Sequence, residues 1–143
     1  SIIATDMHYH VSLIELISNR ASQEEWHIDC FTERMNYGKI LLHAADLSNP
    51  TRPFVTSRAW AERVSEEFNA QGKSEKENGI PVSTFLLSHD LKSFVKNELF
   101  FSGHIVFPMW KELVRLYPDM SHITDQIASN LDSWKGLVKN DAK

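Results

Sequence analysis

Apolar residues recur along this chain at intervals of three and four positions, which is the repeat of one face of an α-helix. Only five Gly and five Pro occur among the 143 residues, so few positions interrupt these helices. A chain of this length usually forms one domain. We therefore expect an all-α helical bundle without a second domain.

Five helices are expected from the positions where Pro, Gly and polar residues interrupt this apolar pattern. Pro50 and Pro53 keep the segment after the second helix extended, and Pro108 removes a backbone hydrogen bond and kinks the fourth helix. Residues 82–91 are expected to form a loop. The first predicted helix runs from near the N-terminus to about Asn19, and the second from the capping-box pattern Ser22–Glu25 to about Asp46. The third runs from near Ser57 to Gly79 and the fourth from about Ser93 to Tyr117. The fifth begins at about Ile123 and ends before the polar tail 139–143.

Two apolar stripes are expected to face the core. On the first helix the stripe is Ile3, Met7, Val11, Ile14 and Ile17. On the second helix it is Ile28, Phe31, Met35, Gly38, Leu42 and Ala45. Because no capping signal precedes the apolar residues of the first helix, we expect the chain to begin partway through a longer protein.

Composition argues against several classes of protein. Fifteen Lys and Arg against nineteen Asp and Glu give a net charge of -4, which disfavours binding to nucleic acid. The apolar runs are far shorter than the roughly 20 residues that cross a bilayer, so no transmembrane segment is expected. Cys30 is the single cysteine and no secretory signal opens the chain, so we expect a reducing, intracellular and cytoplasmic setting.

An acidic side chain stands at the C-terminal end of the second predicted helix. The helix dipole disfavours an anion there by roughly 0.3 to 1 kcal/mol, so Asp46 is unexpected unless a cation compensates it. A divalent cation would do so, and His43, three residues earlier on the same face, is in reach as a second ligand or a supporting hydrogen-bond partner. Alternatively, Asp46 caps the following turn and His43 is a core histidine with satisfied hydrogen bonds.

A second pattern lies on the fourth predicted helix, where Glu98, Phe101 and Ile105 share one face. An aromatic surface beside one hydrogen-bonding side chain is typical of a pocket for a planar heterocycle. The alternative is a core stripe with Glu98 at its solvated edge. A further apolar face on the third helix is by spacing alone more typical of core packing: Trp60, Val64 and Phe68.

Two histidine patterns do not indicate a metal site. His8 and His10 are two residues apart and point in different directions on a helix, so we interpret them as surface or partner-contact residues. His89-Asp90 looks like the metal-binding dyad of HD-type phosphohydrolases, but a match of two residues carries almost no information. The chain has no serine-nucleophile, Walker, HExxH or Cys/His-cluster motif.

Several ordered motifs resemble the C-terminal half of the catalytic domain of class I 3',5'-cyclic nucleotide phosphodiesterases. Residues 4–10 resemble the A-T-D-M-x-x-H motif of that family, and residues 43–50 resemble its highly specific H-x-A-D-L-S-N-P signature. The remaining matches follow in the family's order: Trp60, Glu66–Gly72, Glu75, Gly79–Ser83 and Pro108–Trp110. The resemblance covers nearly the whole chain, so residues 1–143 are expected to be the C-terminal part of a single catalytic domain.

The resemblance implies hydrolysis of cAMP, cGMP or both to 5'-nucleotides by a two-metal mechanism. Asp46 would ligate a tightly held Zn²⁺, with Mg²⁺ or Mn²⁺ as its neighbour. Phe101 would stack on the purine while Val64 clamps its opposite face, and Glu98 would take the place of the family's purine-selecting Gln. The other implied substrate contacts are Phe68 in the apolar wall, Asn49, Trp60 and Leu47 in the base pocket, and Met7 near the metals.

Two departures from the family pattern affect this expectation. The H-N-x-x-H and H-D segments, which supply the general acid and most metal ligands, would precede Ser1. The chain therefore has no catalytic residue of its own, needs the N-terminal half of the same domain as its partner, and is expected to be inactive alone. Because an ionised Glu98 only accepts hydrogen bonds where Gln also donates, we expect weaker or pH-dependent binding of the base.

Two other functions remain open. A catalytically silent module with the same fold would bind cyclic nucleotides or act as a scaffold without hydrolysis. An unrelated helical bundle that dimerises through aromatic surface would bind neither nucleotide nor metal.

Overall fold

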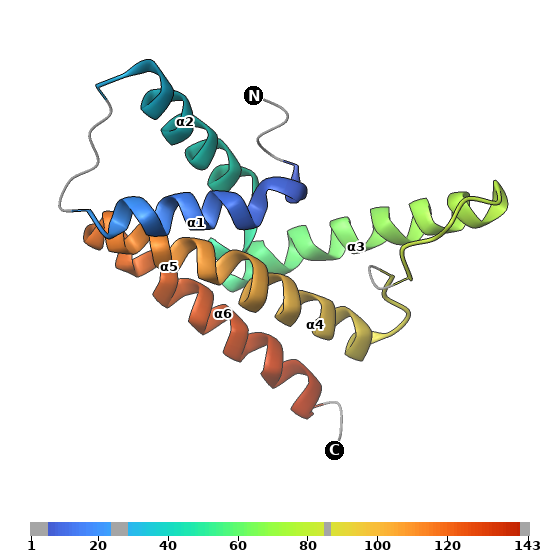
Figure 1. The fold of residues 1–143 in the computed structure, drawn as a ribbon. Helices are drawn as coiled ribbons and strands as arrows, with labels where there is room; N and C mark the ends of the chain where they lie inside the picture. Colours follow the sequence, from blue (N-terminus) through green and yellow to red (C-terminus); the bar gives the residue numbers. More distant parts are fainter. Residues whose placement is uncertain (1–5, 24–28, 85–86, 141–143) are drawn as a thin grey trace.

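The computed structural model of the chain describes residues 6–23, 29–84 and 87–140, and these form helices joined by short connections (Figure 1). No strand occurs within those ranges, which confirms the all-α prediction. The α-helices are α1 (His10–Ala21), α2 (Phe31–Asp46), α3 (Phe54–Glu77), α4 (Leu91–Phe100), α5 (Phe107–Leu116) and α6 (Ser121–Asn140). Shorter elements are the 3-10 turns η2 (Met7–Tyr9), η3 (Asn49–Thr51) and η6 (Pro118–Met120), and the π-helical η5 (Phe101–Val106).

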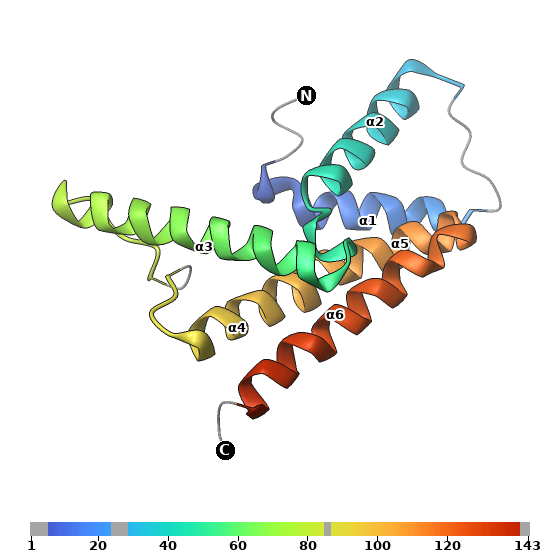
Figure 2. The same ribbon diagram turned by 180° about the vertical axis from the view of Figure 1, so that it is seen from behind.

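The predicted fourth helix is a continuous rod made of α4, η5 and α5 (Figures 1 and 2). Asp90 begins it with a capping box, in which its carboxylate accepts from the Ser93 backbone N–H at 2.7 Å. In η5 the Phe107 N–H donates to the carbonyl of Ser102, five residues back. Since Pro108 has no N–H, the helix must rearrange its hydrogen bonds here, and a π-helical turn does so without ending the rod.

The main core lies between α1, this rod and α6. Its buried members are Leu13, Ile17, Ile40, Ala44, Leu47, Val106, Met109, Trp110, Leu113 and Ile127. A second cluster surrounds the fully buried Trp134, which Phe54 and Phe94 meet edge-on at centroid distances of 4.9 and 5.4 Å. Because Phe54 belongs to α3 and Phe94 to α4, this cluster fixes both helices against α6.

Helix α3 begins three residues earlier than predicted, directly after Pro53, and it remains helical through its polar end. Gly79 stops it with a left-handed φ of 69°, which favours glycine. The Gly79 N–H donates to Lys76 and the Ile80 N–H to Glu75, which is the hydrogen-bond pattern of a Schellman motif. The predicted end of this helix is therefore confirmed, together with its physical cause.

The predicted apolar stripe of the first helix is confirmed in its second half and wrong in its first half. Ile17 is fully buried and Ile14 packs against the main core, as predicted. Met7 and Val11 are instead 44% and 65% exposed, and Ile3 lies outside the described residues. At the start of α1 the buried position belongs to His10, a polar residue that the apolar spacing could not single out.

Helix α2 begins later than predicted, at Phe31. Ser22, the predicted capping residue, instead follows the end of α1, where its hydroxyl donates to the Ser18 carbonyl at 2.9 Å. Glu25, the other half of the predicted capping box, lies outside the described residues. The predicted end at Asp46 is confirmed.

The predicted stripe of α2 does not face the described core, which contradicts the expectation. Phe31, Met35 and Leu42 are 72%, 45% and 41% exposed. The face that is buried consists of Ile40, His43 and Ala44. In both views α2 diverges from the other helices (Figures 1 and 2). This helix therefore has two apolar faces, and only one of them packs against the described residues.

No helix among the described residues combines the length and the apolar character needed to cross a membrane.

Asn130 of α6 is a buried polar residue that holds the turn η3 in place. Its amide nitrogen donates to the carbonyls of Pro50 and Arg52 at 2.8 and 2.7 Å, and its oxygen accepts from Gln126 at 2.9 Å. Both amide hydrogens are thus used on the segment that carries Asn49. Sequence spacing gave no signal for this role, because the contact spans 80 residues.

Replacing Asn130 with leucine is expected to lower the free energy of unfolding by about 2 to 3 kcal/mol. The substitution preserves the side chain's size but leaves two carbonyls without donors in a dry site. Chemical denaturation of the 143-residue chain measures the change. Ser129→Ala, at an exposed position of the same helix, is the control and should change stability by less than about 0.5 kcal/mol. Equal stability of Asn130→Leu and the parent chain would contradict this role.

Candidate functional site

One cavity of about 610 Å³ is lined by Asp46 and by all eight predicted substrate contacts, whereas His43, the possible second ligand, does not line it. It lies between the end of α2, the turn η3, helix α3 and the rod formed by α4 and η5. The predicted residues that line it are Met7, Asp46, Leu47, Asn49, Trp60, Val64, Phe68, Glu98 and Phe101. Its volume is within the usual range for a small-molecule site. Residues spread over nearly a hundred positions are therefore brought together around one space.

Asp46 is the last residue of α2 and its side chain is exposed toward this cavity. No described residue donates a hydrogen bond to its carboxylate or forms an ion pair with it, so the predicted capping of the next turn does not occur. The carboxylate thus stands uncompensated at the negative end of a helix, an arrangement that a cation would stabilise.

His10 of α1 and His43 of α2 form a buried pair, and His43 lies one helical turn before Asp46. His10 Nε2 lies 3.0 Å from the carbonyl oxygen of Ile105, and His10 Nδ1 lies 2.8 Å from His43 Nε2. Because a carbonyl only accepts, His10 carries its proton on Nε2, and its Nδ1 accepts from His43. Burial lowers the pKa of His10, which keeps the ring neutral, as this arrangement requires.

This pair joins α1, α2 and η5 on one side of the cavity. The interpretation of His10 as a surface or partner-contact residue is therefore wrong, since the side chain is 5% exposed, whereas His8 is exposed as predicted. His43 is fully buried and hydrogen-bonded, in agreement with its interpretation as a core histidine. A pattern of two histidines could not reveal their different roles, because the partner of His10 lies 33 residues away.

Asn49 forms part of the cavity wall on η3. Its amide nitrogen donates to the Ser57 carbonyl at 3.2 Å, while its Oδ1 atom is buried and has no hydrogen-bond partner among the described residues. The Asn49 side chain is thus oriented by the hydrogen bond from its amide nitrogen to α3. Asn130 fixes the same turn from the other side.

Aromatic and aliphatic side chains from two elements line the cavity. Phe101 and Ile105 belong to the π-helical turn, and Val64 and Phe68 come from successive turns of α3. These four side chains are half-buried, whereas Trp60 is 57% exposed. Spacing alone favoured a core role for the α3 residues, but they line a space between helices. An apolar lining with aromatic rings is typical of a site for a planar ring.

Glu98 places a carboxyl group inside this largely apolar cavity. No hydrogen bond or ion pair reaches it from the described residues, and burial raises its pKa to about 7. The neighbouring Asn97 donates to the Leu87 carbonyl at 3.4 Å and to the Ser88 hydroxyl at 3.2 Å, so its amide is used elsewhere. The side chain is half-buried, so it lies between the pocket position and the solvated edge that the sequence left open.

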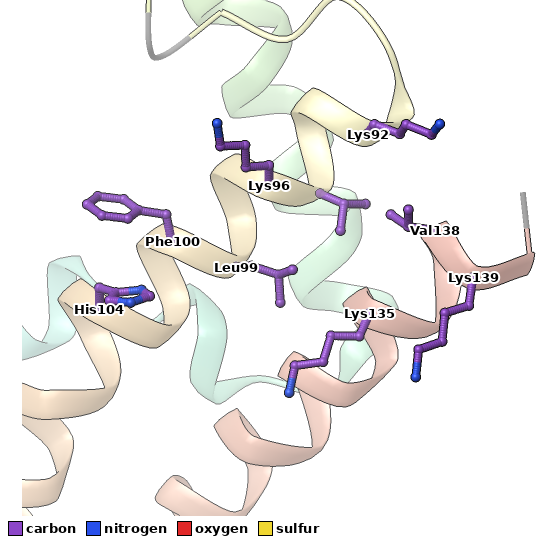
Figure 3. Close-up of a pocket in the computed structure, with 9 residues that line it drawn as sticks. Lys92, Lys96, Leu99, Phe100, His104, Lys135, Val138 and Lys139 are labelled. Carbon is purple, nitrogen blue, oxygen red and sulfur yellow. The ribbon is translucent and has the colours of Figure 1, made fainter. Parts of the chain in front are cut away.

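A second hollow of about 580 Å³ lies between α4 and α6 (Figure 3). Leu99 and Val138 belong to its apolar lining. Four lysines surround it: Lys92, Lys96, Lys135 and Lys139. None of the predicted site residues lines this groove, and four ammonium groups disfavour a divalent cation. The larger cavity is therefore the candidate functional site.

Metal ligands are incomplete in the part of the chain that the structure describes. No group of three or more His, Cys, Asp or Glu side chains gathers there in a way that would hold a metal ion. His89-Asp90 is not such a site, because Asp90 caps α4. A metal ion at Asp46 fits the charge of that helix end but requires further ligands from outside the described residues.

Known proteins with similar sequences point to one family. The family model described as 3'5'-cyclic nucleotide phosphodiesterase matches residues 1–127. Isoform F of a Drosophila melanogaster 3',5'-cyclic-AMP phosphodiesterase is 30% identical over 96% of this chain, and isoforms N/G show the same identity. The chain spans only 22% and 14% of the lengths of these two relatives.

Solved structures show the same fold. The phosphodiesterase domain of Salpingoeca rosetta rhodopsin phosphodiesterase superposes with a TM-score of 0.92 at 28% identity, over 99% of this chain and 44% of that one. The structure of LmjPDEB1 in complex with IBMX gives a TM-score of 0.86 at 29% identity, over 97% of this chain and 42% of that one. With these matches and the ordered motifs of the cavity, the chain belongs to the 3',5'-cyclic nucleotide phosphodiesterase family.

Proposed function

We propose that residues 1–143 are the C-terminal, substrate-pocket part of a catalytic domain that hydrolyses 3',5'-cyclic nucleotides to 5'-nucleotides. The observation that carries this proposal is the convergence of all nine predicted site residues on one cavity. The similar Drosophila melanogaster proteins are cyclic-AMP phosphodiesterases, so cAMP is the first substrate to test, and cGMP is the second.

In this proposal the purine lies between the apolar walls. Phe101 stacks on one face and Val64 contacts the other, while Phe68, Leu47 and Trp60 close the pocket around them. Asn49 lines the base pocket from η3, and Glu98 meets the hydrogen-bonding edge of the base. The cyclic phosphate then points toward the end of α2, where Met7 and Asp46 lie.

Asp46 would hold one of two divalent cations, Zn²⁺ beside Mg²⁺ or Mn²⁺. When bound, such cations activate water and stabilise the negative charge that develops on a phosphate during hydrolysis. The residues of this chain contribute one carboxylate to that site and orient the nucleotide beside it. The general acid and the other ligands would come from the upstream half of the same domain.

The exposed apolar face of α2 supports this division of the domain. Phe31, Met35 and Leu42 form a continuous stripe that the described residues do not cover. Burying such a stripe is favourable by about 25 cal/mol per Å² of apolar surface. We therefore assign it to the interface with the upstream half, and we call the two parts together the complete domain. The cytoplasmic setting expected from the single cysteine stays a prediction.

The test is hydrolysis of cAMP and cGMP by the complete domain in the presence of Mg²⁺ or Mn²⁺. We expect 5'-nucleotide as the product, with turnover that a chelator abolishes and added metal restores. A folded, metal-loaded domain that binds cyclic nucleotide without forming product would instead favour the catalytically silent module. A folded domain that binds neither nucleotide would contradict the proposal, because the cavity would then not be a nucleotide site.

A further inference from the structure

The groove between α4 and α6 combines an apolar floor with a concentration of positive charge. Lys92 and Lys96 come from successive turns of α4. Lys135 and Lys139 come from successive turns of α6. Among the described residues, no Asp or Glu side chain lines this space of about 580 Å³, which we call the lysine-rimmed groove. Positive charge is therefore concentrated here in a chain whose net charge is -4.

Three of the four lysines have no role in holding the fold. Lys135 Nζ lies 3.1 Å from a carboxylate oxygen of Asp132, three residues earlier on α6. The other three ammonium groups form no ion pair or hydrogen bond within the part of the chain that the structure describes. All four lysines are exposed. Because neighbouring ammonium groups repel one another, an anionic partner would stabilise this arrangement.

The floor between the two rows of lysines is apolar and recessed. Val95 of α4 is 1% exposed, while Leu99 of α4 and Val138 of α6 are half-buried. Figure 3 shows Leu99 and Val138 between the lysines of α4 and the lysines of α6. At one end of the groove the rings of Phe100 and His104 are stacked, with their centroids 5.2 Å apart. Both helices thus contribute apolar side chains to the centre and lysines to the flanks.

This arrangement matches the surface that two helices of a bundle present to a third helix. In such packing the apolar side chains of the third helix enter the groove, and charged side chains on its two flanks pair with the neighbouring helices. Here the flanking charges of the groove are all positive. The complementary helix therefore carries Asp or Glu on both sides of an apolar stripe. The α4 side of the groove, from Lys92 to His104, spans about 18 Å, which is roughly three helical turns.

We propose that the lysine-rimmed groove is a docking site for an acidic amphipathic helix of a partner protein. The apolar stripe of that helix contacts Leu99 and Val138, and its carboxylates pair with the lysines on both sides. This inference does not rest on the proposed function, because none of the predicted site residues lines the groove. Of the described residues, Phe100 alone lines both spaces, so the docked helix lies directly beside the candidate site.

Other occupants match these observations less well. If two copies of the chain met groove to groove, each would bring four further lysines to the same place, and like charges repel. A bilayer surface attracts lysines, but a flat surface does not reach a floor in which Val95 is 1% exposed. We assign the upstream half to the apolar stripe of α2, and α2 lies at the other end of the molecule in both views (Figures 1 and 2).

The experiment measures the binding of synthetic peptides to the complete domain by fluorescence anisotropy. The acidic peptide is a helix of three heptads with Leu at positions a and d and Glu at positions e and g. One control peptide has Lys at e and g, and the other has Ser at a and d. Hydrocarbon staples between b and f positions keep all three peptides helical. We expect the acidic peptide to bind about tenfold more tightly than either control, because it alone supplies both carboxylates and apolar side chains.

Charge reversal in the groove tests where the acidic peptide binds. Lys96→Glu combined with Lys139→Glu changes one exposed lysine in each row and should weaken binding by about tenfold or more. The matched control is Lys73→Glu combined with Lys76→Glu, which makes the same change in net charge at exposed positions of α3. Its affinity for the acidic peptide should remain within about twofold of the parent. The unfolding midpoint of each variant, compared with that of the parent, verifies that it folds.

The salt dependence of binding supplies a readout that needs no variant. Raising NaCl from about 50 mM to about 500 mM should weaken binding of the acidic peptide by about fivefold or more, because salt screens interactions between exposed charges. The peptide with Lys at e and g should not lose affinity in this way. An affinity of the acidic peptide that does not change with salt would show that the lysines do not hold it, and would overturn the proposal.

Each result of the binding experiment supports the proposal or contradicts it. Binding that requires the Leu stripe, the Glu flanks and the groove lysines supports it. Equal binding of the Ser peptide, or equal weakening in the two double variants, would show attraction by charge alone and would overturn it. Absence of binding would also overturn it, and association of the domain with phosphatidylserine vesicles would then identify an anionic membrane as the occupant. Cyclic nucleotide hydrolysis, measured on the same samples, distinguishes these failures from failure of the proposed function.

Discussion

Asp46→Asn in the complete domain is expected to lower kcat for cyclic nucleotide hydrolysis by about a thousandfold or more. The substitution keeps the side chain's size but removes the negative charge that stands without a partner at the end of α2. A metal-dependent step derives several kcal/mol of its barrier reduction from charge stabilisation, and about 4 kcal/mol corresponds to a factor of a thousand. Initial rates at saturating metal and nucleotide measure the change.

The control for this prediction is Asp125→Asn, which makes the same chemical change on the exposed face of α6 and outside the cavity. Its activity should remain within about twofold of the parent. The metal content of Asp46→Asn, measured by mass spectrometry, should also be lower than that of the parent. The unfolding midpoint of the metal-free protein should be the same in both. Full activity of Asp46→Asn would remove Asp46 from the metal site.

Leu42→Glu is expected to destabilise the complete domain by about 3 to 5 kcal/mol. Leu42 belongs to the apolar stripe of α2 that we assign to the interface with the upstream half. A carboxylate buried there without a partner is among the most destabilising single changes. Chemical denaturation of the complete domain gives the change in the free energy of unfolding.

The 143-residue chain without its upstream half is the matched control for Leu42→Glu. In that chain Leu42 is already 41% exposed, so the same substitution should change stability by less than about 0.5 kcal/mol. An equal and small effect in both proteins would show that the upstream half does not cover this face of α2.

The sequence predicted helix ends better than helix starts. Gly79 and the prolines act within a few positions, and the helices end or change where these residues stand. The start of α2 was wrong, because Ser22 follows α1 instead of capping α2, and the sequence did not identify Asp90 as the cap of α4. The π-helical turn is a partial exception. Pro108 indicated an interruption, but how the hydrogen bonds rearrange depends on the packing of the whole rod.

The buried faces were harder to predict because they depend on distant contacts. Helix α2 carries two apolar faces, and periodicity could not tell which of them meets the described residues. In α1 one of the three buried positions belongs to His10, whose partners lie 33 and 95 residues away. The structural role of Asn130 was not predicted for the same reason, since it depends on the carbonyls of a turn far earlier in the chain.

The candidate site was predicted by motifs, and the structure adds its geometry. Resemblance selected residues from four separate segments, and folding brings them to one cavity. Spacing alone would have assigned Trp60, Val64 and Phe68 to the core. The two acidic residues of the cavity became distinguishable only in three dimensions. The carboxylate of Asp46 is exposed, whereas Glu98 is half-buried and its pKa is raised by burial.

The decisive measurement is a crystal structure of the complete domain with a bound cyclic nucleotide and anomalous scattering from the metals. We expect the purine between Phe101 and Val64, its hydrogen-bonding edge on Glu98, and an anomalous peak beside the Asp46 carboxylate. A nucleotide bound elsewhere, such as in the lysine-rimmed groove between α4 and α6, or a metal site without Asp46, would contradict it.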